Sequence, residues 1–365
     1  MRVKLEEVCE RGSSNLKQSD VVEMTGDYPI YGASGYIGNV DFYHQEKPYV
    51  AVVKDGAGIG RTTLHPAKSS VIGTMQYLLP KDNVLPEYLY YVVSYMHLEK
   101  YFTGATIPHI YFKDYKNEEF NLDSLDKQKE IVDALGKCEV VIESRKQEIQ
   151  LLDELIKARF VELFGTLQDN RNGYDIVTVE EVCSMIKDGT HQTPTYTEDK
   201  ENGYKFLSSK DVMTQKIDWT DIKYIPADLH EKLYATIQPQ RNDILMSKNG
   251  VNYGVAAIND TDEVFDIYVS LALLRPTEAI NPVYFRCVIN NPDTKRQFDG
   301  SIKGIGVPNL HLGEIKKTKI LLPPMQLQEE YVSFVNQVDK SKVAVQKSLD
   351  ETQQLFDALM QEYFG

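Results

Sequence analysis

Residues 104–110 of the chain read Gly-Ala-Thr-Ile-Pro-His-Ile, and residues 304–310 read Gly-Ile-Gly-Val-Pro-Asn-Leu. The same shift of 200 positions places Phe164-Gly165 on Phe364-Gly365. A single match of this kind arises easily by chance among common residues. Self-similarity that returns at one fixed spacing is instead the signature of a repeated structural unit.

Further matches upstream occur at slightly smaller shifts, as expected when surface loops differ in length. Lys54-Asp55-Gly56, followed by Gly60, corresponds to Lys248-Asn249-Gly250, followed by Gly254. Because several matches keep the same order, we predict an internal duplication. A chain of 365 residues is long enough for two halves that each bury their own core.

Each half begins with short apolar runs bounded by turn residues, which predict β-strands. A proline at a plausible first helical position then predicts helices over residues 86–100 and 282–298. We therefore predict two globular α+β domains, at residues 1–116 and 166–322.

A long proline-free stretch follows each globular domain and repeats apolar residues at alternating spacings of four and three. These residues are Ile131, Leu135, Cys138, Ile142, Ile149, Leu152, Ile156 and Leu163 in the first half, and Tyr331, Val335, Val338, Val345, Leu349, Phe356, Leu359 and Tyr363 in the second. The pattern, interrupted at Arg145, Lys342 and Thr352, predicts a coiled-coil seam. Equivalent repeats require the two helices, at residues 117–165 and 323–365, to run antiparallel, with a pseudo-two-fold relation between the halves.

Charge, apolar runs and cysteine spacing limit the classes of function that the sequence allows. The net charge is −14, but residues 117–165 and 323–365 carry −9 of it, so each globular domain is free to present a basic face. No apolar run is long enough for a membrane span, and the first residues do not resemble a signal peptide. The four cysteines stand far apart, which favours reduced thiols over a zinc site.

Motifs for catalysis are missing from the sequence. The glycine-rich run Gly56-Ala57-Gly58-Ile59-Gly60 fits neither the phosphate loop nor the dinucleotide-binding pattern. No metal-binding histidine pair and no nucleophilic serine motif occurs. We expect no catalytic residue and no metal site in this chain.

Paired polar loops at matching places of the repeat are the remaining candidates. Their side chains are of the types that grip phosphates and read base edges. The candidate DNA-binding residues are Ser34, Tyr36, Lys54, Arg61, Thr62, His65, Thr103, Thr106 and His109 in the first domain, and Lys187, Thr190, His191, Lys248, Asn249, Asn252, Tyr253, Lys303 and Asn309 in the second.

This order of domains and helices resembles the specificity (S) subunit of type I restriction-modification enzymes, over essentially the whole chain. The residues that carry the resemblance are 28–35, 53–56 with Gly60, 104–109, and the helix entries at 122–128 and 322–328. The resemblance implies two target-recognition domains, each reading one half of a bipartite DNA sequence. It also implies that the two helices fix the gap between the half-sites and dock two methyltransferase subunits.

By the same resemblance this chain is not itself an enzyme. S-adenosylmethionine, ATP and Mg²⁺ would act in the methyltransferase and restriction subunits, and the complex would be cytoplasmic, with double-stranded DNA as its substrate. Two alternatives remain open from the residues alone: an autonomous restriction-methylation enzyme, and a scaffold or binding module that does not act on DNA.

Overall fold

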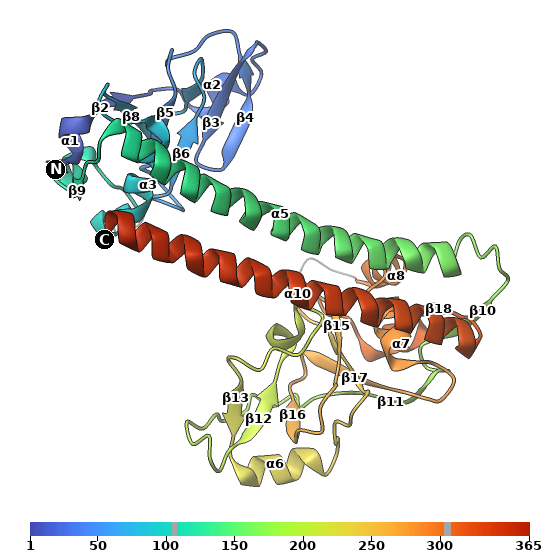
Figure 1. The fold of residues 1–365 in the computed structure, drawn as a ribbon. Coiled ribbons are helices and arrows are strands. Elements are labelled where there is room, and N and C mark those ends of the chain that lie inside the picture. Colours follow the sequence, from blue (N-terminus) through green and yellow to red (C-terminus); the bar gives the residue numbers. More distant parts are fainter. Residues whose placement is uncertain (104–107, 303–307) are drawn as a thin grey trace. The chain divides into compact units, whose positions relative to one another are not determined.

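The computed structural model describes residues 1–103, 108–302 and 308–365. The chain divides into two compact units. Unit 1 comprises Met1–Glu148 together with Val345–Gly365, and unit 2 comprises Ile149–Ala344. Both chain termini therefore belong to unit 1, where they are marked in Figure 1.

Unit 1 contains three small sheets and several short helices. Its strands are β1 (Arg2–Lys4), β2 (Cys9–Ser13), β3 (Tyr28–Gly32), β4 (Gly35–Val40), β5 (Tyr49–Val53), β6 (Thr62–His65), β7 (Ser70–Val71), β8 (Met75–Pro80) and β9 (Glu119–Asn121). Its helices are α1 (Leu5–Val8), α2 (Gln18–Val21), α3 (Pro86–Tyr95), the 3-10 helix η1 (Leu98–Tyr101), α4 (Phe112–Tyr115), the first part of α5 (Leu125–Phe164) and the last part of α10 (Met325–Phe364). The sheets have the strand orders β2-β8-β5-β6, β4-β3-β7 and β1-β9.

All five residues of β5 are buried, which places this strand at the centre of unit 1. Successive side chains of a strand point to opposite faces. Val50 and Val52 accordingly join the core formed with α3, while Tyr49, Ala51 and Val53 join a second cluster with Tyr77. A continuous run of apolar residues thus anchors both faces of the sheet.

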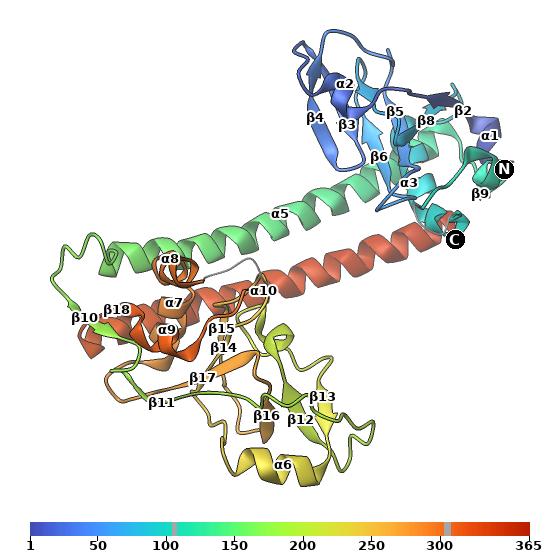
Figure 2. The same cartoon turned by 180° about the vertical axis from the view of Figure 1, so that it is seen from behind.

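Unit 2 follows the same plan with longer loops, and it is seen from behind in Figure 2. Its strands are β10 (Asp175–Thr178), β11 (Cys183–Asp188), β12 (Tyr204–Leu207), β13 (Lys223–Ile225), β14 (Ile244–Ser247), β15 (Ala256–Ile258), β16 (Phe265–Ile267), β17 (Leu271–Pro276) and β18 (Lys319–Leu322). Its helices are η2 (Ser209–Val212), α6 (Ala227–Tyr234), α7 (Pro282–Ile289), α8 (Pro292–Ser301) and α9 (Leu312–Lys317), with the remaining parts of α5 and α10. The sheets have the orders β11-β17-β14-β15, β13-β12-β16 and β10-β18.

The same hydrogen bond closes the core in each unit. The hydroxyl of buried Tyr88 in α3 donates to the carbonyl of Asn121 at 3.0 Å. In unit 2 the hydroxyl of buried Tyr284 in α7 donates to the carbonyl of Leu321, also at 3.0 Å. The acceptors are 200 residues apart, as in the sequence matches, so the structure supports the predicted duplication.

Helices α5 and α10 contribute to the core of each unit. In unit 1, Ile131 and Leu135 of α5 share a cluster with Met360 of α10. In unit 2, Phe164 of α5 packs against Tyr331 of α10, with ring centroids 5.4 Å apart. Phe164 ends α5 at Gly165, whose φ of +72° is the left-handed conformation that commonly stops a helix. The first of the two repeated Phe-Gly pairs therefore marks the end of α5.

Two predicted helices are wrong in their extent. The helix expected over residues 282–298 is two helices, α7 and α8, because Pro292 cannot continue the backbone hydrogen bonding of α7. The side chain of Asn291 caps the second helix by accepting the N–H of Asp293 at 2.9 Å. The helix expected over residues 86–100 similarly ends at Tyr95, and His97 follows with a φ of +51°.

The mixed α/β character of the fold is confirmed. The boundaries predicted for the four segments of the chain remain a prediction. Strands β9 and β18, which precede α5 and α10, pair with β1 and β10 near the start of each domain.

Candidate nucleic-acid interface

In unit 1 two of the sequence-predicted polar loops lie against each other. The N–H of Gly56 donates to the carbonyl of Pro108 at 3.0 Å, and the N–H of Ile110 donates to the carbonyl of Lys54 at 3.0 Å. Gly56 has a φ of +84°, which favours glycine, so the turn after β5 depends on this residue. The loop after β5 is therefore held beside residues 108–110.

Unit 2 repeats this arrangement. The N–H of Gly250 donates to the carbonyl of Pro308 at 3.0 Å, and the N–H of Leu310 donates to the carbonyl of Lys248 at 2.7 Å. Gly250 also has a φ of +84°. We call these two places loop pair 1 (residues 54–61 with 108–111) and loop pair 2 (residues 248–254 with 308–311).

Loop pair 1 carries a mixture of paired and free polar groups. The Nδ1 atom of His109 lies 2.5 Å from Oδ1 of Asp55, and Nζ of Lys54 lies 3.9 Å from the other carboxylate oxygen. Arg61 is exposed and forms no ion pair within the described residues. Thr103 is exposed, and its hydroxyl donates to the carbonyl of His109 at 3.1 Å. Arg61 is thus the cation of this loop pair that is free to meet an external anion.

Loop pair 2 uses its lysine differently. Lys248 is buried, and its Nζ lies 2.6 Å from Oδ2 of Asp188 at the end of β11. The exposed His191 lies 3.3 Å from the same carboxylate oxygen. Asn252 and Asn309 are exposed, so amide groups rather than the lysine face solvent here.

Two candidate residues lie in the interior, and for them the predicted DNA contact does not fit the structure. His65 is buried and stacks on Tyr49 with ring centroids 5.2 Å apart. Tyr253 is buried, and its hydroxyl donates to Oδ1 of Asp299 at 2.5 Å. His65 is the last residue of β6, and Tyr253 belongs to the hydrophobic core cluster of unit 2. We leave them, with buried Lys248, out of the candidate interface.

The other candidates are spread over several places. Ser34 and Tyr36 belong to the β3–β4 hairpin, where Tyr36 is 62% exposed and donates to Asn39 at 3.0 Å. Thr62 is half-buried, and its hydroxyl donates to the carbonyl of Gly60 at 3.3 Å. Exposed Lys187 donates to the carbonyl of Thr236 at 3.2 Å. Thr190 and Asn249 are half-buried, while Thr106 and Lys303 lie outside the described residues.

The structure adds exposed residues that the sequence patterns did not single out. Tyr111 is 51% exposed, and its ring stacks on that of His109 with centroids 6.4 Å apart. Nζ of Lys113 lies 5.3 Å from the centre of the Tyr111 ring. An exposed aromatic ring beside a cation suits the backbone of a nucleic acid, with the ring against a sugar and the cation at a phosphate. The alternation of His109, Tyr111 and Lys113 was the available signal.

Within the described residues no group of three histidine, cysteine, aspartate or glutamate side chains is placed to hold a metal ion. None of the described helices is apolar over a length that would cross a membrane. The polar loop pairs remain the candidate site, and their chemistry is hydrogen bonding and charge.

Comparison with known proteins places the chain. A family model described as the type I restriction modification DNA specificity domain matches residues 1–154 and 172–353. Two similar proteins are specificity subunits of the type I restriction enzymes MjaVIII and MjaIX from Methanocaldococcus jannaschii. The first is 23% identical over 310 residues, covering 80% of this chain and 72% of the relative; the second is 21% identical over 307 residues, covering 78% and 69%.

Two solved structures share the fold. One is the S subunit of a type I restriction-modification system from M. genitalium, with a TM-score of 0.62 at 16% identity, covering 100% of this chain and 96% of the other. The second comes from a study of complex assembly and conformational transition of the type I R-M system, with a TM-score of 0.56 at 16% identity and coverage of 100% and 97%.

Proposed function

Because the chain belongs to the family of type I restriction modification DNA specificity domains, we propose that each of its two loop pairs reads one half of a bipartite DNA target. The chain is a specificity subunit, whose role is DNA recognition rather than catalysis. The family match covers both halves of the chain and decides against a scaffold that does not act on DNA.

The observation that carries this proposal is the repeated backbone geometry of the loop pairs. Gly56 and Gly250 make the same hydrogen bond, to Pro108 and Pro308, with the same positive φ. The side chains around this shared frame differ, with Arg61 in one loop pair and Asn252 in the other. A common frame with different side chains is what two readers of different half-sites need.

The exposed side chains match the groups of a DNA groove. Arginine pairs with the O6 and N7 atoms of guanine, and asparagine pairs with N6 and N7 of adenine. Arg61 of loop pair 1 and Asn252 and Asn309 of loop pair 2 are exposed representatives of these two types. Lys113, beside Tyr111, supplies a cation for a phosphate.

We further propose that α5 and α10 form an antiparallel coiled-coil spacer that sets the gap between the half-sites. Each helix has 40 residues, which corresponds to roughly 60 Å at 1.5 Å per residue. Within unit 2 the contacts follow an antiparallel order, because Asp153 meets Lys342 while the later Arg159 meets the earlier Glu330.

The partners of this chain follow from the same family. We propose that it binds two methyltransferase subunits and, in the full complex, restriction subunits. S-adenosylmethionine, ATP and Mg²⁺ would be held by those partners, and base extrusion for adenine methylation would occur there. The proposed compartment is the cytoplasm, where the host DNA is.

Electrophoretic retention of DNA tests the proposal. The purified chain with a methyltransferase partner should retain one bipartite duplex at low salt, and a duplex scrambled in either half should be released. Since phosphate contacts add a salt-dependent affinity to any duplex, the comparison is repeated at rising salt. Equal retention of all duplexes, or of none, contradicts the proposal.

A further inference from the structure

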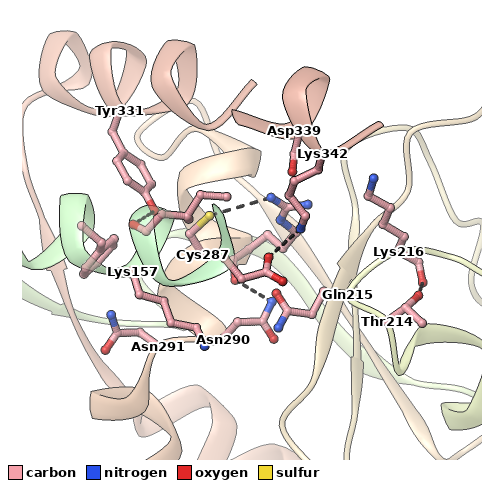
Figure 3. A pocket seen from close by; sticks show the side chains of 14 residues that line it. Lys157, Thr214, Gln215, Lys216, Cys287, Asn290, Asn291, Tyr331, Asp339 and Lys342 are labelled. Atoms are coloured by element: carbon pink, nitrogen blue, oxygen red, sulfur yellow. Dashed lines mark hydrogen bonds and ion pairs between the residues drawn. The ribbon is translucent and has the colours of Figure 1, made fainter. Parts of the chain in front are cut away.

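A hollow of about 200 Å³ lies within unit 2, where α5, α7, α10 and the loop after η2 meet (Figure 3). This volume is far above the roughly 10–15 Å³ that a single water molecule needs. It is separate from loop pair 2, since none of residues 248–254 and 308–311 lines it. We call it the unit 2 basic pocket.

Four cations and two carboxylates line the unit 2 basic pocket. The cations are Lys157, Lys216, Arg286 and Lys342, and the carboxylates are those of Asp153 and Asp339. Only Lys342 is neutralised by an ion pair within the described residues, with Asp153 at 2.5 Å. The pocket lining therefore carries an excess of positive charge, with two exposed lysines and the half-buried Arg286 available to attract an anion.

Arg286 is the most informative of these side chains. It lies in α7, it is half-buried, and its Nε atom is buried without a hydrogen-bond partner among the described residues. Its one side-chain hydrogen bond within the described residues is weak: a terminal nitrogen donates to Sγ of Cys287 at 3.9 Å. A buried donor of a guanidinium group is rarely left without an acceptor. An oxyanion in the pocket would supply that acceptor.

The neighbouring polar groups do not neutralise the cations. Burial and the Cys287 thiol raise the pKa of Tyr331, so this residue stays a neutral phenol. Its hydroxyl donates to the carbonyl of Ile156 at 3.3 Å. The side chain of Asn290 is engaged with the backbone of Ala256, to which it both donates and accepts.

We propose that the unit 2 basic pocket binds a phosphate group, with Arg286, Lys157 and Lys216 as its cationic ligands. Guanidinium groups suit phosphate because their planar donors match two of its oxygens, while lysines act as point charges. The pocket has room for a phosphate with some of its hydration water. Two sources share this chemistry: free inorganic phosphate and the phosphate of a small ester such as a nucleoside monophosphate.

The proposal does not depend on DNA reading, because the pocket and the loop pairs have different linings. A phosphate held by Lys216 of the loop after η2 and Lys157 of α5 would tie that loop to the helix within unit 2. Bound phosphate should therefore stabilise the folded chain in proportion to the logarithm of its concentration.

Calorimetric titration of the full chain with inorganic phosphate, at constant ionic strength, tests the proposal. We expect one site per chain. The double variant Lys157→Gln/Lys216→Gln should weaken binding by about tenfold or more, since each charge-assisted contact contributes measurably. Both lysines are exposed, so this variant is expected to fold. The matched control is Lys232→Gln/Lys340→Gln, which removes two exposed lysines elsewhere in unit 2.

A second arm replaces Arg286 and compares ligands. Arg286→Gln should abolish phosphate binding while circular dichroism shows an unchanged fold. Titration with AMP identifies the source: tighter binding than phosphate supports an ester, and equal or weaker binding supports free phosphate. The slowing of Cys287 alkylation by phosphate, followed by mass spectrometry, gives an independent readout, because this thiol lines the pocket.

Three results would overturn the proposal. The first is no binding of phosphate or AMP by the unmodified chain. The second is equal binding by the pocket double variant and the matched control. The third is that the chain binds a DNA duplex but neither small anion, and that the pocket double variant no longer binds that duplex. This result would assign the cations to the DNA surface instead.

Discussion

Gln128 at the start of α5 accepts a hydrogen bond from the backbone N–H of Leu85 at 2.9 Å. Leu85 precedes the first residue of α3, and such N–H groups at a helix start lack an intrahelical partner. The amide of Gln128 also donates to the carbonyls of Asn83 and Asp123, each at 3.0 Å. One buried side chain therefore joins the start of α3 to that of α5.

Unit 2 contains the same link. Gln328 of α10 accepts the N–H of Asn281 at 2.8 Å and donates to the carbonyls of Ala279 and Pro323 at 3.3 and 2.8 Å. Gln328 follows Gln128 by 200 residues, the spacing of the repeat, and each glutamine joins a long helix to its domain.

Replacing Gln128 by leucine should destabilise unit 1 by about 2–4 kcal/mol, because three partly buried backbone groups lose their hydrogen-bond partner. Urea unfolding followed by circular dichroism measures the change. Gln147→Leu, at an exposed position of the same helix, is the control and should change stability by less than about 0.5 kcal/mol. Equal unfolding curves for the two variants would contradict the role given to Gln128.

His65 makes the stability of unit 1 depend on pH. Burial lowers the pKa of His65 to about 4, from an ordinary value near 6.5. Between these values the unfolded chain binds a proton that the folded chain does not. The contribution of neutral His65 is thus complete above about pH 6.5 and is lost as the pH falls towards 4, by roughly 3 kcal/mol in all.

Urea unfolding at pH 5 and pH 7 checks this dependence. In His65→Gln the loss of stability between pH 7 and pH 5 should be smaller than in the unmodified chain. His97→Gln is the control, since its side chain is 72% exposed. An unchanged pH dependence in His65→Gln would show that the ring is protonated at little cost.

Lys248 is expected to act on the fold rather than on DNA. Its Nζ lies 2.6 Å from Oδ2 of Asp188, and both side chains are largely buried. Lys248→Met leaves that carboxylate without its cation and should cost about 3 kcal/mol. The double variant with Asp188→Asn should recover much of the loss, as measured by urea unfolding.

DNA binding gives the opposite test for the same lysine. A lysine that contacts a phosphate adds about one to the slope of log affinity against log salt concentration. We expect this slope to be the same for the double variant and the unmodified chain. A slope reduced by about one would return Lys248 to the DNA interface.

The proposed spacer predicts a change of gap. Deleting four residues of α5 around Glu148 and four of α10 around Val345 removes about 6 Å of helix. The preferred gap should shorten by about two base pairs at 3.4 Å each, with unchanged half-sites. Retention of duplexes with varied gaps measures this. Alanine replacement of the same residues without deletion is the control, and altered half-site bases would contradict the spacer.

The sequence predicted the duplication and the long helices because both leave periodic signals. The shift of 200 residues aligned Gly104 with Gly304, and the four-three pattern found Ile131, Leu135 and Tyr331, all buried. It missed Phe160 and Met360, which are buried although they lie off that pattern. Phe160 packs against Tyr284 of α7 as well as Tyr331 of α10, and Met360 belongs to the core cluster of unit 1, so their burial depends on tertiary packing.

The interface was less predictable because side-chain type does not reveal exposure. Lysine and histidine suit phosphate contact, yet Lys248 is buried in an ion pair with Asp188 and His65 is buried in a stack with Tyr49. Their partners come from distant parts of the chain, which no local pattern shows. Arg61 is exposed, and its contact with DNA remains a prediction.

A methylation map tests the central claim most directly. DNA is exposed to the complex of the chain with the proposed methyltransferase partner, and modified adenines are located by long-read sequencing. We predict one motif with two specified halves and a fixed unspecified gap. Arg61→Ala should reduce the discrimination between bases in one half of the motif, and Asn252→Ala should do so in the other half. Each loss should amount to about 1–3 kcal/mol. A contiguous motif, or relaxation of the same half by both variants, would contradict the claim.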